Sequence, residues 1–260
     1  MSTQSQNIYD NPNFFTAYST LPRSQHGLSG APEWPVLRDM VLNSNTNNRD
    51  TTNGLQNCKV LDLGCGYGWF SRWARDSASA EFVTGIDVSE RMIERAKKFD
   101  DDGGYDSAPK SKDVISYQRH DLETLTLDQS DTDTYHLVYS SLTFHYISDL
   151  GRDIPAVAAV KEKGEEEGEQ QEKEKGTAYP VWPLNSYCEE GLRETSWLGS
   201  EGVRKYHRTI ETYVTLLLES GFVVTGLKEW APAKEDVALR PEWAKERHRP
   251  YFLLVSAEPR

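Results

Sequence analysis

Short apolar runs alternate with stretches of helical spacing along the first half of the chain. The run that starts at Val60 leads into three alternate glycines, and Trp69, Phe70 and Trp73 then begin a helical pattern. A second helical pattern follows Ser89, which is a typical N-cap residue. This alternation predicts an α/β fold with a buried parallel sheet. The expected strands are 60–63, 81–87, 114–119 and 135–140, and the expected helices are 67–77 and 90–99.

The two ends of the chain carry further patterned stretches. Apolar residues on one side of 11–18 and of 34–42 predict two short helices. The segment 21–35 between them is too rich in Pro and Gly for regular structure. Near the other end, an amphipathic pattern predicts a helix over 209–220. The remaining expected strands are 222–230 and 251–257, and the second of these closes the sheet.

Composition narrows the class of protein. The chain has 260 residues, which suits one domain with an appended lid. Its net charge of −12 and its pI of about 5.0 argue against a nucleic-acid groove. The three cysteines lack metal-ligand spacing and favour a reducing compartment, and no apolar run reaches the length of a membrane span. We therefore expect a soluble cytoplasmic protein without metal, nucleic acid or membrane span, in an oligomeric state that the sequence leaves open.

The glycine loop at 64–68 indicates the ligand. A strand that runs through glycines into a helix brings bare backbone and a positive helix end close to a nucleotide-like molecule. The spacing is GxGxG rather than the GxGxxG of dinucleotide sites, and Asp62 stands two residues before the first glycine. A carboxylate there would repel a pyrophosphate but suits an ammonium or sulfonium group. The loop residues Gly64, Cys65 and Gly66 are therefore expected, with Asp62, to contact S-adenosylmethionine (SAM).

A second carboxylate follows the next strand. Asp87 lies 23 residues after Gly64, at a strand end where an acid can accept hydrogen bonds from both ribose hydroxyls. Val88 and Met92 would flank the adenine with apolar surface. A role for Asp87 as a cap of the following helix is the alternative.

At these residues the sequence resembles the class I SAM-dependent methyltransferases, in particular the type-11 group that acts on small molecules. The resemblance covers roughly 8–150 and 177–258, and it implies a Rossmann-like three-layer sandwich with a lid insertion. It also implies that Asp121 accepts from the adenine amino group, that the backbone of Leu122 meets the ring, and that Ser140 faces the methionine part of SAM. An exposed loop acid is the alternative for Asp121.

The resemblance also assigns residues to the cap and to the acceptor side. Tyr18 and Arg23 would touch the methionine carboxylate, or Tyr18 would only pack the N-terminal segment onto the domain. His145 is a candidate catalytic base or orienting group, with a structural role as the alternative, because a lone histidine is more often structural. Tyr146, Trp182 and His207 would face the acceptor, although simple lid packing is the alternative for most of the lid aromatics.

The pattern departs from the family after residue 160. The family has a fifth apolar strand there, whereas this chain has Ile154–Val160 and then a charged low-complexity run. We therefore expect the usual fifth strand to be lacking, with six main strands instead of seven. The expected organisation is an N-terminal cap segment (1–57), a SAM-binding core (58–160), an acidic linker (161–176), and a lid with the closing strands (177–260).

These residues predict a methyltransferase that moves the methyl group of SAM to a small-molecule acceptor. The alternative is a SAM-binding protein that has lost turnover, because a missing fifth strand would open the wall of the acceptor pocket. A nicotinamide dehydrogenase is disfavoured by the glycine spacing and by Asp62.

Overall fold

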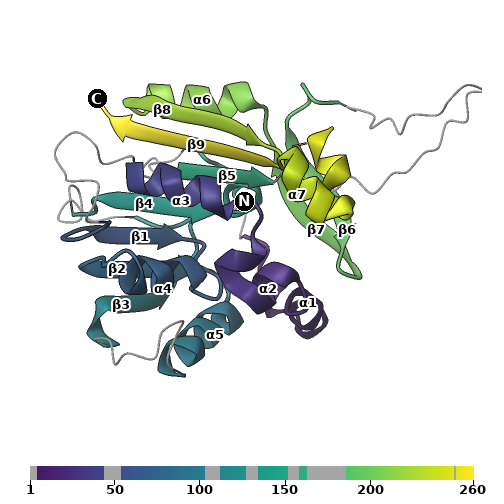
Figure 1. The fold of residues 1–260 in the computed structure, drawn as a ribbon. Helices are drawn as coiled ribbons and strands as arrows, with labels where there is room; N and C mark the ends of the chain where they lie inside the picture. The colour runs from purple at the N-terminus through teal and green to yellow at the C-terminus, as the bar shows by residue number, and fades with distance from the viewer. Residues whose placement is uncertain are drawn as a thin grey trace, which may run out of the picture.

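Figure 1 shows the computed structural model of the chain, which describes residues 5–43, 54–102, 112–126, 134–151, 158–162, 186–248 and 250–260. Within these residues, seven strands form one sheet in the order β3-β2-β1-β4-β5-β9-β8, and β6 and β7 pair separately. The strands are β1 (Lys59–Leu63), β2 (Phe82–Asp87), β3 (Ile115–Arg119), β4 (Leu137–Ser141), β5 (Ala158–Glu162), β6 (Gly191–Trp197), β7 (Ser200–His207), β8 (Phe222–Trp230) and β9 (Phe252–Pro259). The helices are α1 (Pro12–Tyr18), α2 (Pro22–His26), α3 (Trp34–Asn43), α4 (Trp69–Asp76), α5 (Glu90–Asp101), α6 (Ile210–Glu219) and α7 (Lys234–Leu239).

Strand β1 occupies the centre of the parallel part of the sheet. It pairs in parallel with β2 on one side and with β4 on the other, so that Val60 lies between Val83 and Leu137. The side chains of Val60, Leu61 and Leu63 are fully buried. A near-continuous apolar run is what a strand covered on both faces requires, which explains why this segment forms the centre.

Helices cover the sheet on its faces, and their apolar sides form the core. Leu37 of α3, Phe70 of α4 and Ile93 of α5 pack in one buried cluster with residues of the strands. On the opposite face, Leu61 and Leu63 pack in a second cluster with Ile86 of β2 and with residues that follow β3 and β4. The α/β Rossmann-like class expected from the sequence is therefore confirmed. No helix among the described residues is both long enough and apolar enough to cross a membrane.

The expectation that the fifth strand is lacking is wrong. Strand β5 pairs in parallel with β4 and antiparallel with β9, so seven strands complete the sheet instead of six. The parallel ladder uses only Ala158, Ala159 and Val160, which are the last three residues of the apolar stretch Ile154–Val160. Lys161 and Glu162, assigned to the linker from their charge, pair with β9 only. A three-position ladder thus needs a far shorter apolar run than a full-length central strand, and the rest of the acidic run lies outside the described residues.

The expectation of irregular structure over 21–35 is also wrong in part. Helix α2 forms at Pro22–His26, and a 3-10 turn follows at Gly27–Gly30. Proline is favoured in the first turn of a helix because its ring fixes a helical φ and no amide donor is needed there. Gly27, with φ of 60°, then ends the helix. The expected helix N-cap at Ser89 is confirmed, since its side chain accepts a hydrogen bond from the amide of Met92.

Candidate functional site

A cavity of about 550 Å³ lies at the carboxyl ends of the parallel strands. In Figure 1 the arrowheads of β1, β4 and β5 point toward the side where α1, α2, α7 and the β6–β7 hairpin lie. The lining of the cavity comes from the loops after β1 to β4, from the N-terminal segment, and from residues of the hairpin and of 240–243. The carboxyl edge is where open α/β sheets bind ligands, and the volume falls in the range of small-molecule sites.

The glycine loop shapes one side of the cavity. Gly64 and Gly66 have φ of 73° and 52°, in the left-handed region that favours glycine. A Cβ atom on Gly64 would lie 2.0 Å from Oγ1 of Thr143, so this position has no room for a side chain. A Cβ atom on Gly66 would meet nothing within 4 Å. Because Gly66 also lines the cavity, the open space next to it is available to a ligand.

Asp87 joins this loop to the next helix. Its Oδ2 accepts a hydrogen bond from the amide of Gly66 and its Oδ1 accepts one from the amide of Ser89, both at 2.9 Å. Burial nevertheless raises the pKa of Asp87 to about 6. Each carboxylate oxygen has two lone pairs, so both can still accept from a ligand such as a vicinal diol.

Asp62 lies deeper in the same wall. Its carboxylate accepts a hydrogen bond from Oγ of Ser71 at 2.6 Å, and only 2% of the residue is exposed. Burial, with a contribution from the charge of Asp87, raises the pKa of Asp62 to about 7. A cation bound beside these two acids would stabilise their ionised forms, which fits the sulfonium or ammonium group that the sequence suggested.

The predicted adenine residues gather at the same cavity. Val88, Met92, Asp121 and Leu122 all line it, and Met92 and Leu122 are buried. Oδ1 of Asp121 accepts hydrogen bonds from Oγ of Ser5 at 2.7 Å and from the amide of Glu123 at 2.9 Å. Asp121 is therefore held by two partners and lines the cavity.

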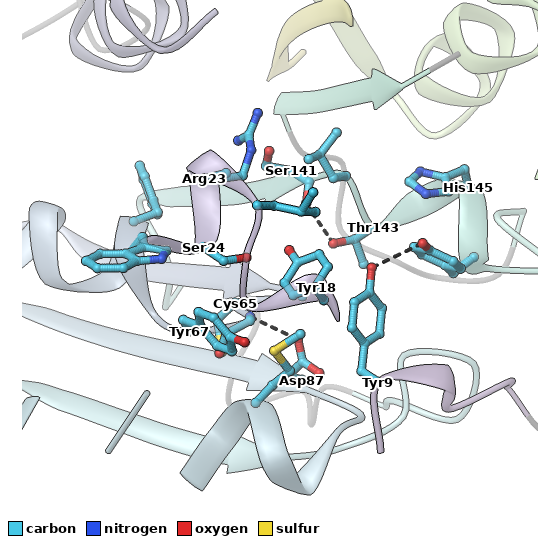
Figure 2. A pocket seen from close by; sticks show the side chains of 18 of the residues that line it. Tyr9, Tyr18, Arg23, Ser24, Cys65, Tyr67, Asp87, Ser141, Thr143 and His145 are labelled. Carbon is cyan, nitrogen blue, oxygen red and sulfur yellow. Dashed lines mark hydrogen bonds between the residues drawn. The ribbon is translucent and has the colours of Figure 1, made fainter. Parts of the chain in front are cut away.

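Aromatic rings of the N-terminal segment close the cavity. The ring of Tyr18 lies edge-on to those of Tyr9, Tyr67 and Trp197, with centroid distances of 5.1, 5.9 and 6.3 Å. Figure 2 shows Tyr18 near the middle of the view, with Asp87 below it and Arg23 above it. Tyr18 thus packs the segment and also lines the cavity, so its two predicted roles do not exclude each other.

Arg23 combines a fixed position with a place in the lining. Its Nη2 donates to Oε1 of Glu33 at 2.5 Å, and Glu33 is fully buried. A guanidinium has five N–H donors in a planar fork, so it can hold Glu33 and still bind a carboxylate in the cavity.

The residues after β4 form the remaining wall. His145 and Tyr146 belong to a 3-10 turn at Phe144–Tyr146, and both line the cavity as predicted. His145 is buried, and its ring centroid lies 4.2 Å from that of Tyr146. The turn therefore places an imidazole and a phenol together at the end of a central strand.

Two of the predicted residues that the structure describes do not line this cavity. Ser140 was expected to face SAM, but it is buried and its hydroxyl donates to the carbonyl of Leu63 at 2.9 Å. The side chains of a strand alternate between its faces, and it is the neighbouring Ser141 that lines the cavity. His207 lies in β7 with Nε2 2.8 Å from the carbonyl oxygen of Tyr187, and it is not among the described residues of the lining. Trp182 falls outside the described residues.

Several lining residues were missed by reading the sequence. Tyr9, Tyr67, Thr143 and Trp243 contribute to the cavity. Tyr67 and Thr143 stand beside predicted site residues, so their proximity to a motif was a usable signal. Tyr9 and Trp243 come from segments far apart in the chain, and no local pattern marks them.

Comparisons with known proteins also indicate a methyltransferase. A family model described as a methyltransferase domain matches residues 60–164, a range that includes the whole of β5. A crystal structure of an S-adenosylmethionine-dependent methyltransferase from Mesorhizobium loti is 34% identical, with a TM-score of 0.65 over 89% of this chain and 99% of that one. A candidate methyltransferase of the same kind from Listeria monocytogenes is 29% identical, with a TM-score of 0.64 over 90% and 99%. An uncharacterized protein from Haemophilus influenzae is 27% identical over 96% of both chains.

Proposed function

Because the chain belongs to the class I SAM-dependent methyltransferases, we propose that it transfers the methyl group of SAM to a small-molecule acceptor. The observation that carries the proposal is the single cavity lined both by Asp87 at the glycine loop and by His145 and Tyr146 after β4. A shared cavity lets donor and acceptor touch, which direct transfer requires.

The described residues fit SAM part by part. Asp87 would accept from the ribose hydroxyls, and Asp121 from the adenine amino group. Val88, Met92 and the backbone of Leu122 would enclose the ring. Three groups would hold the methionine end: Arg23 and Tyr18 its carboxylate, and Asp62 its ammonium or sulfonium charge. The loop residues Gly64, Cys65 and Gly66 would approach the cofactor with little side-chain bulk.

SAM supplies a methyl group bonded to a positively charged sulfur. The chain's own contribution is to hold the acceptor in line with that bond and to exclude water. Placing the reacting atoms about 3 Å apart can lower the barrier by roughly 7–11 kcal/mol. His145 would take the proton of an acceptor that must lose one, since an imidazole titrates near neutral pH.

The alternative of a SAM-binding protein without turnover has lost its motivation. It depended on a missing fifth strand, and β5 is present between β4 and β9. A cytoplasmic location belongs to the same proposal as the enzyme activity. The free thiols of Cys58, Cys65 and Cys188 support a reducing compartment.

The proposal is tested in two steps. Calorimetric titration with SAM and with NAD should give saturable binding of SAM alone. Incubation with SAM and a panel of small hydroxyl, carboxyl and amino acceptors should then release S-adenosylhomocysteine in a manner that depends on one acceptor class. Binding of NAD in preference to SAM would contradict the function, and SAM binding without turnover on any acceptor would favour the alternative.

A further inference from the structure

Two tyrosine hydroxyls meet at the acceptor side of the cavity. The oxygens of Tyr9 and Tyr146 lie 3.1 Å apart, within hydrogen-bond distance, and both residues line the cavity. Tyr9 comes from a 3-10 turn at Ile8–Asp10 in the N-terminal segment, and Tyr146 from the turn after β4, 137 residues later. Figure 2 shows this contact as a dashed line on the side of the cavity where His145 lies.

Ring packing fixes the position of this pair. The ring of Tyr9 lies edge-on to those of Phe14, Tyr18 and Tyr146, at centroid distances of 5.2, 5.1 and 5.9 Å. The ring of Tyr146 is also next to that of His145. Packed rings lose little rotamer freedom when a ligand arrives, so the hydroxyls are presented at a defined place.

The chemistry of two phenols favours one kind of acceptor atom. Each of the two hydroxyls has one hydrogen, and one of these hydrogens makes the hydrogen bond between the two oxygens. The second hydrogen can be donated to a ligand, which then replaces any other acceptor that this hydroxyl has before the ligand binds. An attacking oxygen has a lone pair for the methyl group and another that accepts this hydrogen bond. A neutral amine nitrogen has one lone pair, which the methyl group needs.

The acids of the cavity come from other elements than the tyrosine pair. Asp62, Asp87 and Asp121 belong to the edge of the sheet, and Glu242 belongs to the turn after α7. Tyr18 lies next to Tyr9, and Trp197 lies next to Tyr18, so this part of the wall has rings that suit a flat apolar body. An amine held through its N–H groups would have the phenol oxygens as acceptors, and an uncharged phenol accepts a hydrogen bond less strongly than a carboxylate.

We propose that the Tyr9–Tyr146 hydroxyl pair positions the acceptor by donating a hydrogen bond to it, and that it selects a ring-bearing hydroxyl or carboxylate oxygen over an amine. The inference rests on the proposed function and refines its acceptor class. In the transfer, a lone pair of the acceptor oxygen forms the bond to the methyl carbon, and the electron pair of the broken bond stays on the sulfur. A hydroxyl acceptor also gives up its proton, for which His145 is the neighbouring base, whereas a carboxylate has none to lose.

The test uses three probes with one ring and different polar atoms: phenol, benzoate and aniline. Their affinities are measured by ligand-observed NMR on protein saturated with S-adenosylhomocysteine, so that no turnover is needed. We expect phenol and benzoate to bind at least threefold more tightly than aniline. The variants Tyr9→Phe and Tyr146→Phe, which keep the rings and remove the hydroxyls, should bring this ratio close to one. Tyr206→Phe, in β7 and not among the described lining residues, is the matched control and should keep the ratio.

Separate readings distinguish the possible failures. In all three variants the melting temperature should stay close to that of the wild type, and the affinity for S-adenosylhomocysteine should stay within twofold of it. These two results exclude damage to the N-terminal segment. Equal binding of aniline, binding of none of the probes, or an unchanged ratio in both cavity variants would each overturn the inference. Failure of S-adenosylhomocysteine to bind the wild-type chain would instead overturn the proposed function, and the inference with it.

Discussion

The edge of the sheet and the cap above it build one cavity by different means. The edge consists of the last residues of β1 and β2 and of the residues that directly follow β1, β2 and β3, and backbone hydrogen bonds fix it, as those of Gly66 and Ser89 fix Asp87. The cap consists of residues 5–30 and the β6–β7 hairpin, and ring packing joins its parts, as between Phe14 and Trp197 at 5.4 Å. Side-chain hydrogen bonds tie it to the edge, since Ser5 donates to Asp121 and Ser89 donates to Asp10. We expect the backbone-bonded edge to stay rigid and the cap to be the part that opens when a ligand enters.

One glutamine shows how the cap is assembled. The side chain of Gln6 donates to the carbonyl of Gly202 and accepts from the amide of Arg204, both at 2.8 Å. It thereby satisfies two backbone groups of β7, as a neighbouring strand would. The contact joins positions 196 residues apart, so the cap depends on the tertiary fold and the edge depends on local sequence.

The largest expected effect is on the edge. Gly66→Val should weaken SAM binding more than a hundredfold, about 3 kcal/mol, because the side chain fills the open space beside the loop at a φ that disfavours valine. Gly199→Val is the matched control, since Gly199 also has a positive φ and open space but lies in the hairpin turn. Calorimetric titration should show normal SAM affinity for the control. Equal losses in both variants would mean that strain, and not obstruction of the ligand, is responsible.

A smaller loss is expected from the carboxylate next to the loop. Asp87→Ala should weaken SAM binding by roughly 1–3 kcal/mol, since two ribose hydroxyls lose a charged acceptor. The melting temperature should fall as well, because the amides of Gly66 and Ser89 also lose their partner. Asp39→Ala, at an exposed position in α3, serves as the control. Unchanged affinity in a folded Asp87→Ala variant would rule out the ribose assignment.

The pH dependence of binding should follow the same carboxylate. Its pKa is raised to about 6 by burial, and the ionised form is the one that accepts from the ribose. The contribution of Asp87 to SAM affinity should therefore be complete above pH 7 and fall about tenfold by pH 5, as Asp87 takes up one proton. Asp87→Asn should remove this part of the pH profile, and any fall that remains reports on Asp62. A profile equally steep in the variant would show that Asp87 does not control binding.

The smallest effect is expected on the cap. Gln6→Ala should speed SAM release about fivefold, because the two hydrogen bonds are near the surface and contribute at the low end of the usual range, roughly 0.5 kcal/mol each, and the packed rings remain. Stopped-flow displacement of bound SAM measures the rate. Gln118→Ala, at an exposed position on β3, is the matched control and should leave the rate unchanged. A loss as large as that of Gly66→Val would contradict the distinction between a rigid edge and an openable cap.

The sequence predicted the edge better than the cap for a physical reason. Asp62, Asp87 and Asp121 stand at or just beyond strand ends, so the parallel topology alone brings them to one edge. Ser140 failed because a strand alternates its faces and the register could not be assigned to within one residue. Tyr9 could not be foreseen, since nothing near it in the sequence indicates a contact with Tyr146 or Tyr18. Strand β5 was missed because its ladder with β4 needs only three apolar positions.

The position of β9 determines when the fold can be completed during synthesis. This strand is the last in chain order among the described residues, yet it lies inside the sheet between β5 and β8, with Leu254 and Val255 buried (Figure 1). When only the residues up to α7 have left the ribosome, the sheet therefore ends at β5, and β8 lacks β9, its partner strand among the described residues. Unpaired edges of this kind attract other chains. The nascent chain thus exposes unpaired strands until β9 leaves the exit tunnel and pairs with β5 and β8.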